Sequence, residues 1–175
     1  MSEEKPRLPL SGVTVIDLSH VYNGPYATFL MAMAGAEVIK VEPFQGEHLR
    51  SRGDMGGAAL PFAMLNSNKT FATLNLKTPR GRELLHEMVK RGDVLVENFA
   101  PNAMERLGLG YEDLRKINPR LIYGAGSGYG RTGPNKDYPA MDLTVQAMAG
   151  IMNVTGFPDR PPVKAGPALC DFFGG

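Results

Sequence analysis

Short apolar strands alternate with helical segments along most of this chain, and this alternation limits the possible folds more than any other feature. The run from Val13 to Leu18 is short and rich in β-branched residues, which is typical of a buried strand. A helix is expected next, with Pro25 at its first position and Gly35 at its end. Residues 36–42 then return as a strand. Such a β-α-β unit implies parallel strands joined by a right-handed crossover.

The pattern resumes after a glycine-rich segment, residues 43–66, that we expect to be irregular. Residues 70–76 predict a short strand, and Thr78 and Pro79 open a helix because threonine caps well and proline suits a first turn. The elements expected after it are a strand at 94–96, helices at 101–107 and 111–117, a strand at 121–125 and a helix at 141–149. This order predicts an α/β fold with a Rossmann-like, doubly wound and mostly parallel sheet.

Three segments that follow predicted strands carry the first functional signals. In doubly wound sheets, ligands bind beyond the carboxyl ends of the strands. The segments His20 to Asn23, Asn98 to Phe99 and the glycine loop at 124–133 should therefore lie at one edge. The loop has the spacing G-x-G-x-G-x-G with no helix after it, which disfavours a dinucleotide-binding fingerprint. It is either a plain turn or a loop that a ligand approaches closely.

Charge and composition exclude several classes of function. The net charge is +1, so nothing in it calls for nucleic acid or an acidic membrane surface. The single cysteine, Cys170, cannot form an internal disulfide and fits a reducing compartment. The first ten residues show no secretory signal, and no apolar run approaches the ~18 residues of a membrane helix. We therefore expect a cytoplasmic protein. Its three histidines lack a metal-ligand spacing, so we expect no metal site.

Asp171 differs from the other carboxylates because an apolar stretch precedes it and two phenylalanines follow it. Its position favours the role of a helix N-cap. The same residue is a candidate nucleophile, since a helix dipole at its start would favour the carboxylate anion. Backbone N–H groups of this turn are candidates for stabilising an oxyanion.

Many ordered motifs make the chain, from about Leu10 to Gly175, resemble the class III CoA transferases, the group typified by formyl-CoA transferase and the carnitine CoA transferase. These motifs are LSGV at 10–13, VIDL at 15–18, GP at 24–25, GAEVIKVEP at 35–43, NSNK at 66–69, LNL at 74–76, VLVENF at 94–99, RLG at 106–108, NPR at 118–120 and PPVKAGPALCDFFGG at 161–175. Their number and order, rather than any one of them, carry the resemblance.

The resemblance implies an architecture larger than this chain. Family members are roughly twice as long, and two subunits interlock like chain links, each with a large Rossmann-like domain and a small domain. Residues 1–175 would form the N-terminal part of the large CoA-binding domain, and the small domain and the C-terminal return segment would lie outside them. A homodimer is the expected assembly.

The resemblance also assigns site residues, with Asp171 as the catalytic nucleophile and Asp142 as a substrate-positioning residue. The implied CoA-contacting residues are Val21, Tyr22, Asn23, Lys69, Asn98, Phe99, Ala103 and Arg106. Lysine and arginine suit the phosphates of CoA, as a point charge and a bidentate donor. No metal and no permanently bound cofactor is expected, because the CoA thioester is itself a substrate.

The implied reaction moves CoA from an acyl-CoA to a carboxylic acid through an aspartyl anhydride and an aspartyl-CoA thioester. Two alternatives remain open: a 2-methylacyl-CoA racemase and a noncatalytic CoA-binding module. Racemases of the superfamily place a histidine where Met141 stands, and methionine cannot accept a proton. Formyl-CoA transferase has glutamine, arginine and lysine where this chain has Tyr22, Pro43 and Pro139, which weakens the case for formyl and oxalate as substrates and for identical CoA contacts.

Overall fold

A five-stranded, all-parallel sheet forms the centre of the protein in the computed structural model, which describes residues 7–52, 54–55 and 58–175. Its strands are β1 (Thr14–Asp17), β2 (Glu37–Glu42), β5 (Thr70–Thr73), β6 (Val94–Glu97) and β7 (Ile122–Ala125), in the order β5-β2-β1-β6-β7. The helices are α1 (Asn23–Met33), α2 (Leu60–Asn66), α3 (Pro79–Val89), α4 (Ala103–Arg106), α5 (Tyr111–Ile117), α6 (Asp142–Met148) and α7 (Leu169–Gly174). The predicted α/β class with a parallel sheet is confirmed.

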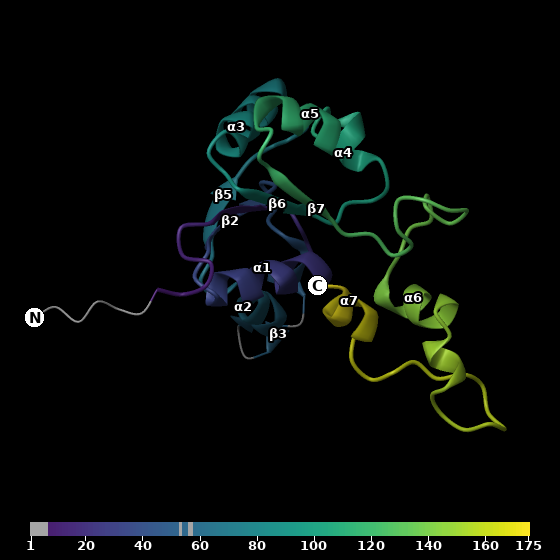
Figure 1. Ribbon diagram of the computed structural model, residues 1–175. Helices are drawn as coiled ribbons and strands as arrows, with labels where there is room; N and C mark the ends of the chain where they lie inside the picture. The colour runs from purple at the N-terminus through teal and green to yellow at the C-terminus, as the bar shows by residue number, and fades with distance from the viewer. Residues whose placement is uncertain (1–6, 53, 56–57) are drawn as a thin grey trace, which may run out of the picture.

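Helices cover both faces of the sheet, as Figure 1 shows, with α1 and α2 on one side and α3, α4 and α5 on the other. Successive side chains of a strand point to opposite faces, so each strand serves two cores. Ile16 joins the larger core with Leu85, Leu95 and Leu114. Val15 joins the smaller core beside α1.

The strand order determines where along the edge of the sheet a crevice for a ligand can form. The chain runs outward from the central β1 to β2 and β5, and then returns to the other side of β1 as β6 and β7. The connections after β1 and β6 therefore leave in opposite directions, and such a switch point opens a crevice at the carboxyl ends of the strands. The segments 18–22 and 98–102 border this crevice.

The boundaries of several elements follow from residues that the sequence already singled out. Gly35 takes a φ of +99° just after α1, and the Thr78 hydroxyl accepts a hydrogen bond from Gly81 N at 3.1 Å at the start of α3. Helix α1 begins at Asn23, two residues before the expected Pro25. Strand β5 and helix α4 are shorter than predicted.

The prediction that residues 43–66 are irregular is wrong for their C-terminal part. Residues 60–66 form α2, although no side chain caps this helix. Apolar packing stabilises it instead, since its residues contact α1 and the 3-10 turn His48–Ser51. Strands β3 (Asp54–Met55) and β4 (Ala58–Ala59) form a small antiparallel pair before it. Residues 53, 56 and 57 of this segment lie outside the described residues.

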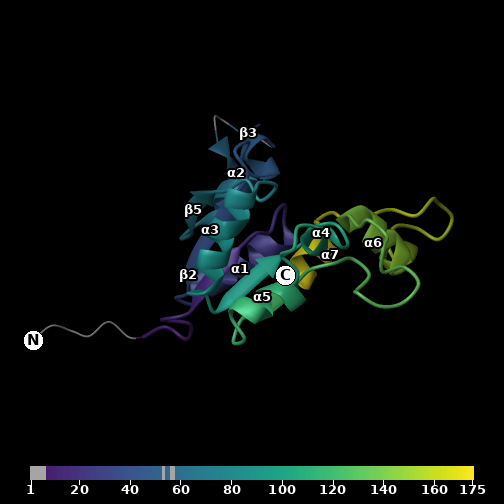
Figure 2. The ribbon, with the colours of Figure 1, turned by 90° about the horizontal axis from the view of Figure 1, so that it is seen from above.

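Helices α6 and α7 lie at the end of the molecule that the crevice faces (Figures 1 and 2). The chain around α6 extends away from the sheet, and α7 returns to pack on α1. The contact is aromatic: the Phe172 ring lies 5.5 Å from the Tyr22 ring and 5.2 Å from the Tyr26 ring, between centroids. This packing brings Asp171 to the crevice beside Asn23, although 148 residues separate the two in the sequence.

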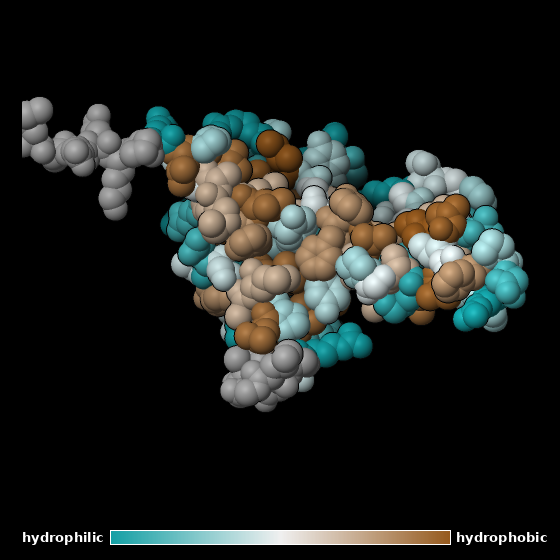
Figure 3. Space-filling model, turned by 90° about the horizontal axis from the view of Figure 1, so that it is seen from below, coloured by the Kyte–Doolittle hydropathy of each residue, from teal (hydrophilic) through white to brown (hydrophobic). Residues whose placement is uncertain are grey.

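Apolar side chains gather on the face that carries α1 and α2, as Figure 3 shows. Four large ones are exposed there: Leu30, Met33, Leu60 and Met64. An exposed apolar surface of this kind often marks a protein interface. Within the described ranges, no helix combines the length and the apolarity that crossing a bilayer requires.

Candidate active site

The Asn98 side chain joins the two loops at the switch point. Its Oδ1 accepts a hydrogen bond from His20 N at 2.8 Å, and its Nδ2 donates one to His20 O at 2.8 Å. The glycine loop completes the arrangement, because a Cβ on Gly126 would lie 2.7 Å from Asn23 Oδ1. The three segments predicted to share one edge therefore do meet. Gly126 is required for close packing, and the loop does not lead directly into a helix as a dinucleotide fingerprint would need, since α6 begins only at Asp142.

A buried charge network lies under these loops, centred on Asp17 at the end of β1. Its Oδ2 lies 3.0 Å from Lys69 Nζ and 3.7 Å from Lys40 Nζ, and it accepts a hydrogen bond from the Thr28 hydroxyl at 2.7 Å. Burial alone would raise the pKa of Asp17, but the two ammonium groups, together with the hydroxyls of Ser19 and Thr28, outweigh it and lower that pKa. These buried contacts fix the base of the crevice.

Lys69 belongs to this network and not to the surface of the site. Its ammonium donates to Asp17, to Thr28 Oγ1 at 2.7 Å and to Pro25 O and Asn66 Oδ1, both at 3.0 Å. Its side chain is 0% exposed, and burial lowers its pKa to about 8. A lysine has three donors, and all are used internally. This geometry argues against the predicted contact between the Lys69 side chain and CoA.

Asp171 is half-buried and borders three cavities. They have volumes of about 1050, 530 and 470 Å³. The cavity of about 530 Å³ is also lined by Val21, Tyr22, Asn23 and Asn98, so five of the predicted site residues lie around one space. Asn23 Nδ2 donates to Asp171 O at 3.2 Å, which ties the first loop to α7. The carboxylate is reachable from these cavities rather than sealed in the core.

Asp171 is not the N-cap of α7, so that prediction is wrong. The helix begins at Leu169 with Ala168 as N-cap, and Asp171 lies within its first turn. The cap comes from another element: Asp142 Oδ1 accepts hydrogen bonds from Cys170 N at 2.8 Å and Asp171 N at 3.4 Å. Its other oxygen accepts from Gln146 Nε2 at 2.7 Å. The Asp171 side chain therefore does not serve as the helix cap.

The electrostatics at Asp171 also differ from the expectation. Burial raises the pKa of this carboxyl above its usual range, and the nearby negative charge of Asp142 raises it further. The helix dipole was expected to favour the anion, and these two effects act against it. The two N–H groups of the first turn are occupied by Asp142, so they are not available to an oxyanion in this arrangement.

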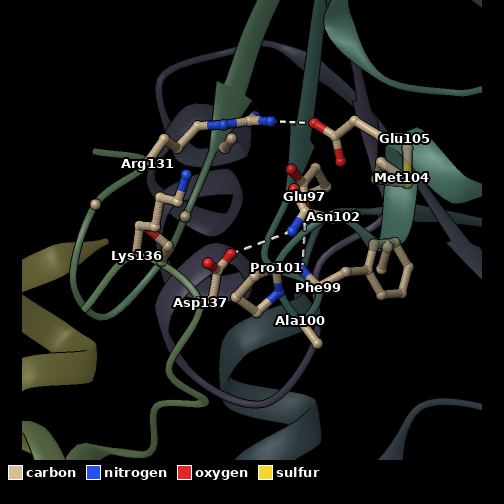
Figure 4. A pocket seen from close by; sticks show the side chains of 15 residues that line it. Glu97, Phe99, Ala100, Pro101, Asn102, Met104, Glu105, Arg131, Lys136 and Asp137 are labelled. Atoms are coloured by element: carbon tan, nitrogen blue, oxygen red, sulfur yellow. Dashed lines mark hydrogen bonds and ion pairs between the residues drawn. The ribbon is translucent and has the colours of Figure 1, made fainter. Parts of the chain in front are cut away.

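A further cavity, of about 350 Å³, lies beyond the end of β6 (Figure 4). The predicted CoA contacts Phe99 and Ala103 line it, whereas Arg106 is exposed and donates to Pro101 O at 3.2 Å. Figure 4 shows Arg131 and Lys136 across the pocket from Phe99, with Arg131 paired to Glu105. Sequence reasoning missed both cations, although Arg131 lies in the glycine loop that it had singled out.

The cavity of about 1050 Å³ carries two more residues that the sequence analysis missed. Its wall is largely apolar, with residues of α2 and α7, and two cations line it as well, Arg52 and Lys164. Met141 and Asp142 border it next to Asp171. Nothing in the spacing of these residues connects Arg52 with Lys164, so only the folded chain reveals them.

The fold and the site together define a class: a doubly wound α/β protein with a reachable carboxylate at the switch point of its sheet and cations in the adjoining cavities. In the described part of the chain, no three His, Cys, Asp or Glu side chains are placed to hold a metal ion. A model of CoA-transferase family III matches residues 10–175. The chain belongs to this family.

Relatives of known activity and solved structures agree with this assignment. The chain is 50% identical to an acetyl-CoA:oxalate CoA-transferase of Acetobacter aceti, covering 98% of this chain and 45% of the relative. It is 42% identical to a succinate–glutarate CoA-transferase of Agrobacterium fabrum, covering 100% and 46%. A CAIB/BAIF family protein from Brucella suis superposes with a TM-score of 0.91 at 39% identity, covering 97% and 47%. The chain thus spans about half the length of these relatives.

Proposed function

We propose that the full-length protein is a CoA transferase in which Asp171 is the nucleophile. One observation carries this proposal: a half-buried carboxylate borders three cavities at the switch point, where the strands of a doubly wound sheet present their ligand. A thioester held in these cavities has direct access to the Asp171 oxygens. The test is whether acyl-CoA forms a covalent adduct on Asp171.

The proposed reaction proceeds by covalent catalysis. The Asp171 carboxylate attacks the thioester carbonyl of the acyl-CoA, which forms a mixed anhydride and releases the CoA thiolate. The thiolate then attacks the aspartyl carbonyl, which forms an aspartyl-CoA thioester and releases the donor acid. The acceptor carboxylate attacks this thioester, and the same two steps run in reverse. No net oxidation or reduction occurs at any step.

The proposed CoA contacts are divided between two of the cavities. Val21, Tyr22, Asn23 and Asn98 lie around the reacting thioester, and Phe99 and Ala103 lie farther out, with Arg106 at the surface beyond them. Arg131 and Lys136 replace Lys69 as the cations proposed to face the CoA phosphates. Asp142 is proposed to position Asp171 through the backbone of α7.

The two alternative functions have less support. A racemase needs a base on each face of the substrate's α-carbon. Met141 is 58% exposed and borders the cavities beside Asp171, so the position that carries a histidine in racemases holds a thioether here. A noncatalytic CoA-binding module would not require a reachable carboxylate. Both alternatives predict that no covalent adduct forms on Asp171.

We also propose that at least one of the exchanged acids is a dicarboxylic acid. The largely apolar cavity of about 1050 Å³ has room for an acyl chain, and Arg52 and Lys164 provide positive charge for a second carboxylate. The printed activities of the relatives are consistent with this class, since they name oxalate, succinate and glutarate.

Arg52→Leu should reduce kcat/KM for dicarboxylic acceptors by about tenfold to a hundredfold, the value of a hydrogen bond to a charged group. Monocarboxylic acceptors of the same length should be affected much less, because they have no second carboxylate to bind. Initial rates with matched pairs of acids measure the difference. Arg160→Leu, an exposed arginine outside the cavities, is the control. An equal loss for both classes of acid would contradict the assignment of Arg52.

Asp142→Asn should move the acid limb of the pH–kcat/KM profile to lower pH. The charge of Asp142 raises the pKa of Asp171, so removing this charge lowers that pKa and leaves Asp171 ionised at more acidic pH. Asparagine keeps an oxygen that can accept the α7 N–H groups, which preserves the cap. The midpoint of the limb is compared with that of Asp113→Asn, an exposed carboxylate on α5. A midpoint that stays in place or rises would refute the coupling.

We propose that residues 1–175 form part of a large CoA-binding domain, and that the full-length protein is a cytoplasmic homodimer whose contacts cover the apolar face of α1 and α2 (Figure 3). Light scattering on the full-length protein measures this directly, and a monomeric mass would exclude the dimer.

A further inference from the structure

The backbone of Val21 is strained at the point where the chain enters the site. Its φ is +63°, in the left-handed region that β-branched residues rarely adopt. Val21 follows β1 at the switch point, and it lines two of the cavities that Asp171 borders. A strained residue keeps such a conformation only where its surroundings hold it in place.

Two side chains hold this segment. On one side, the Asn98 amide binds both backbone polar groups of the preceding His20. On the other side, Glu47 Oε1 accepts a hydrogen bond from Val21 N at 2.8 Å. The strained peptide is therefore fixed between the Asn98 amide, just after β6, and a carboxylate from the segment after β2.

Glu47 is itself buried and rigidly placed. It is 4% exposed, and its Oε2 accepts a hydrogen bond from Leu49 N at 3.0 Å. Its backbone N donates to Glu42 Oε1 at 3.1 Å, and Glu42 binds Arg50 at 2.6 Å. In the described ranges Glu47 forms no ion pair, so both of its oxygens serve backbone N–H groups. A buried carboxylate needs such hydrogen bonds to offset its lost hydration, so Glu47 is held firmly against both backbone segments.

We propose that Glu47 is a positioning residue that holds Val21 in the left-handed conformation and thereby sets the loop against Asp171. The link to the reacting carboxylate is short: Val21 precedes Tyr22 and Asn23, and Asn23 Nδ2 binds Asp171 O at 3.2 Å. Glu47 lines none of the three cavities that Asp171 borders, so it acts through the backbone that it holds. That backbone is the Val21 loop and the 3-10 turn His48–Ser51, and the change at Val21 tests the first of these two. The inference rests on the proposed role of Asp171 in CoA transfer.

Glu47→Ala should lower kcat for acyl exchange at least tenfold, because Val21 then relaxes to a negative φ and the loop shifts. Adding Val21→Gly should recover several-fold of this loss, since glycine adopts a positive φ without strain. The thermal midpoint should stay at the lowered value of Glu47→Ala. A purely structural role for Glu47 would not be relieved by a change at Val21, so the rescue separates the two roles.

A crystal structure of the Glu47→Ala full-length protein gives a readout independent of activity. Val21 at a negative φ supports the proposal, and Val21 still near +63° overturns it. If Glu47→Ala does not fold, Glu47→Gln serves in its place, because its amide oxygen accepts from only one of the two N–H groups. It should then show a smaller loss, again recovered by Val21→Gly. A double variant no better than the single one overturns the proposal in either case.

The adduct on wild-type Asp171 keeps the two proposals distinguishable. If wild-type protein forms no adduct, the proposed transferase function fails. If wild-type protein forms the adduct and Glu47→Ala forms it at the same rate, the transferase stands and the positioning role of Glu47 is wrong.

Discussion

Incubation of the full-length protein with an acyl-CoA should attach CoA to Asp171, and Asp171→Ala should abolish both this adduct and acyl exchange. The aspartyl-CoA thioester adds the mass of CoA less one water, and borohydride reduces it to an alcohol at the same residue. Peptide mass spectrometry locates the change. Loss of a catalytic nucleophile removes the covalent path altogether, so exchange should fall by about 10⁴-fold or more.

Asp159→Asn is the matched control for this experiment, because it removes an exposed carboxylate from the loop before α7. It should keep the adduct and the full rate. Exchange at the wild-type rate in Asp171→Ala would contradict the proposed mechanism. If the wild-type protein catalyses exchange but the label is found on another residue, that residue is the nucleophile instead of Asp171. Absence of both exchange and adduct would favour a binding module.

Asp17→Asn should lower the free energy of unfolding by about 3–5 kcal/mol, the cost of breaking a buried ion pair by removing one partner. The substitution removes the negative charge that faces Lys40 and Lys69, whose side chains are both 0% exposed. Two ammonium groups would then remain buried near each other. Urea unfolding measures the loss.

Two comparisons test whether charge is the cause. Lys116→Met, which breaks an exposed pair on α5, should cost less than about 1 kcal/mol. Adding Lys69→Met to Asp17→Asn should restore part of the stability, because one uncompensated charge is removed. The lowered pKa of Asp17 means that its contribution is present above the unfolded-state pKa of about 3.9 and is lost as the pH falls below it. A loss in Asp17→Asn no larger than in the surface control would contradict this account.

Much of the fold could be read from local sequence, because the signals of parallel sheets are local. Parallel strands are buried on both faces, and β1, β2 and β6 are accordingly short and rich in valine, isoleucine and leucine, although Lys40 interrupts β2. Gly35 and Thr78 marked helix ends by their own backbone and side-chain chemistry. Helix α2 was missed because it has no capping residue, and its stability comes from packing against α1.

The site could be predicted only in part. The meeting of the His20, Asn98 and Gly126 segments follows from parallel topology, since all three follow strands that end at one edge. The resemblance to a family pointed to Asp171, and the structure places it at this edge. The roles of Lys69 and Asp142 could not be foreseen, because each depends on partners distant in the chain.

The sequence by itself determined the alternating elements, the parallel sheet and the family, because periodicity, turn residues and ordered motifs are properties of neighbouring residues. The tertiary structure alone decided which charges are buried in the fold and which line the cavities. Lys69 is neutralised by Asp17, 52 residues away, and α7 is capped by Asp142 from 28 residues upstream. The strength of an ionic or polar interaction depends on distance and burial, and both are set only when the chain has folded.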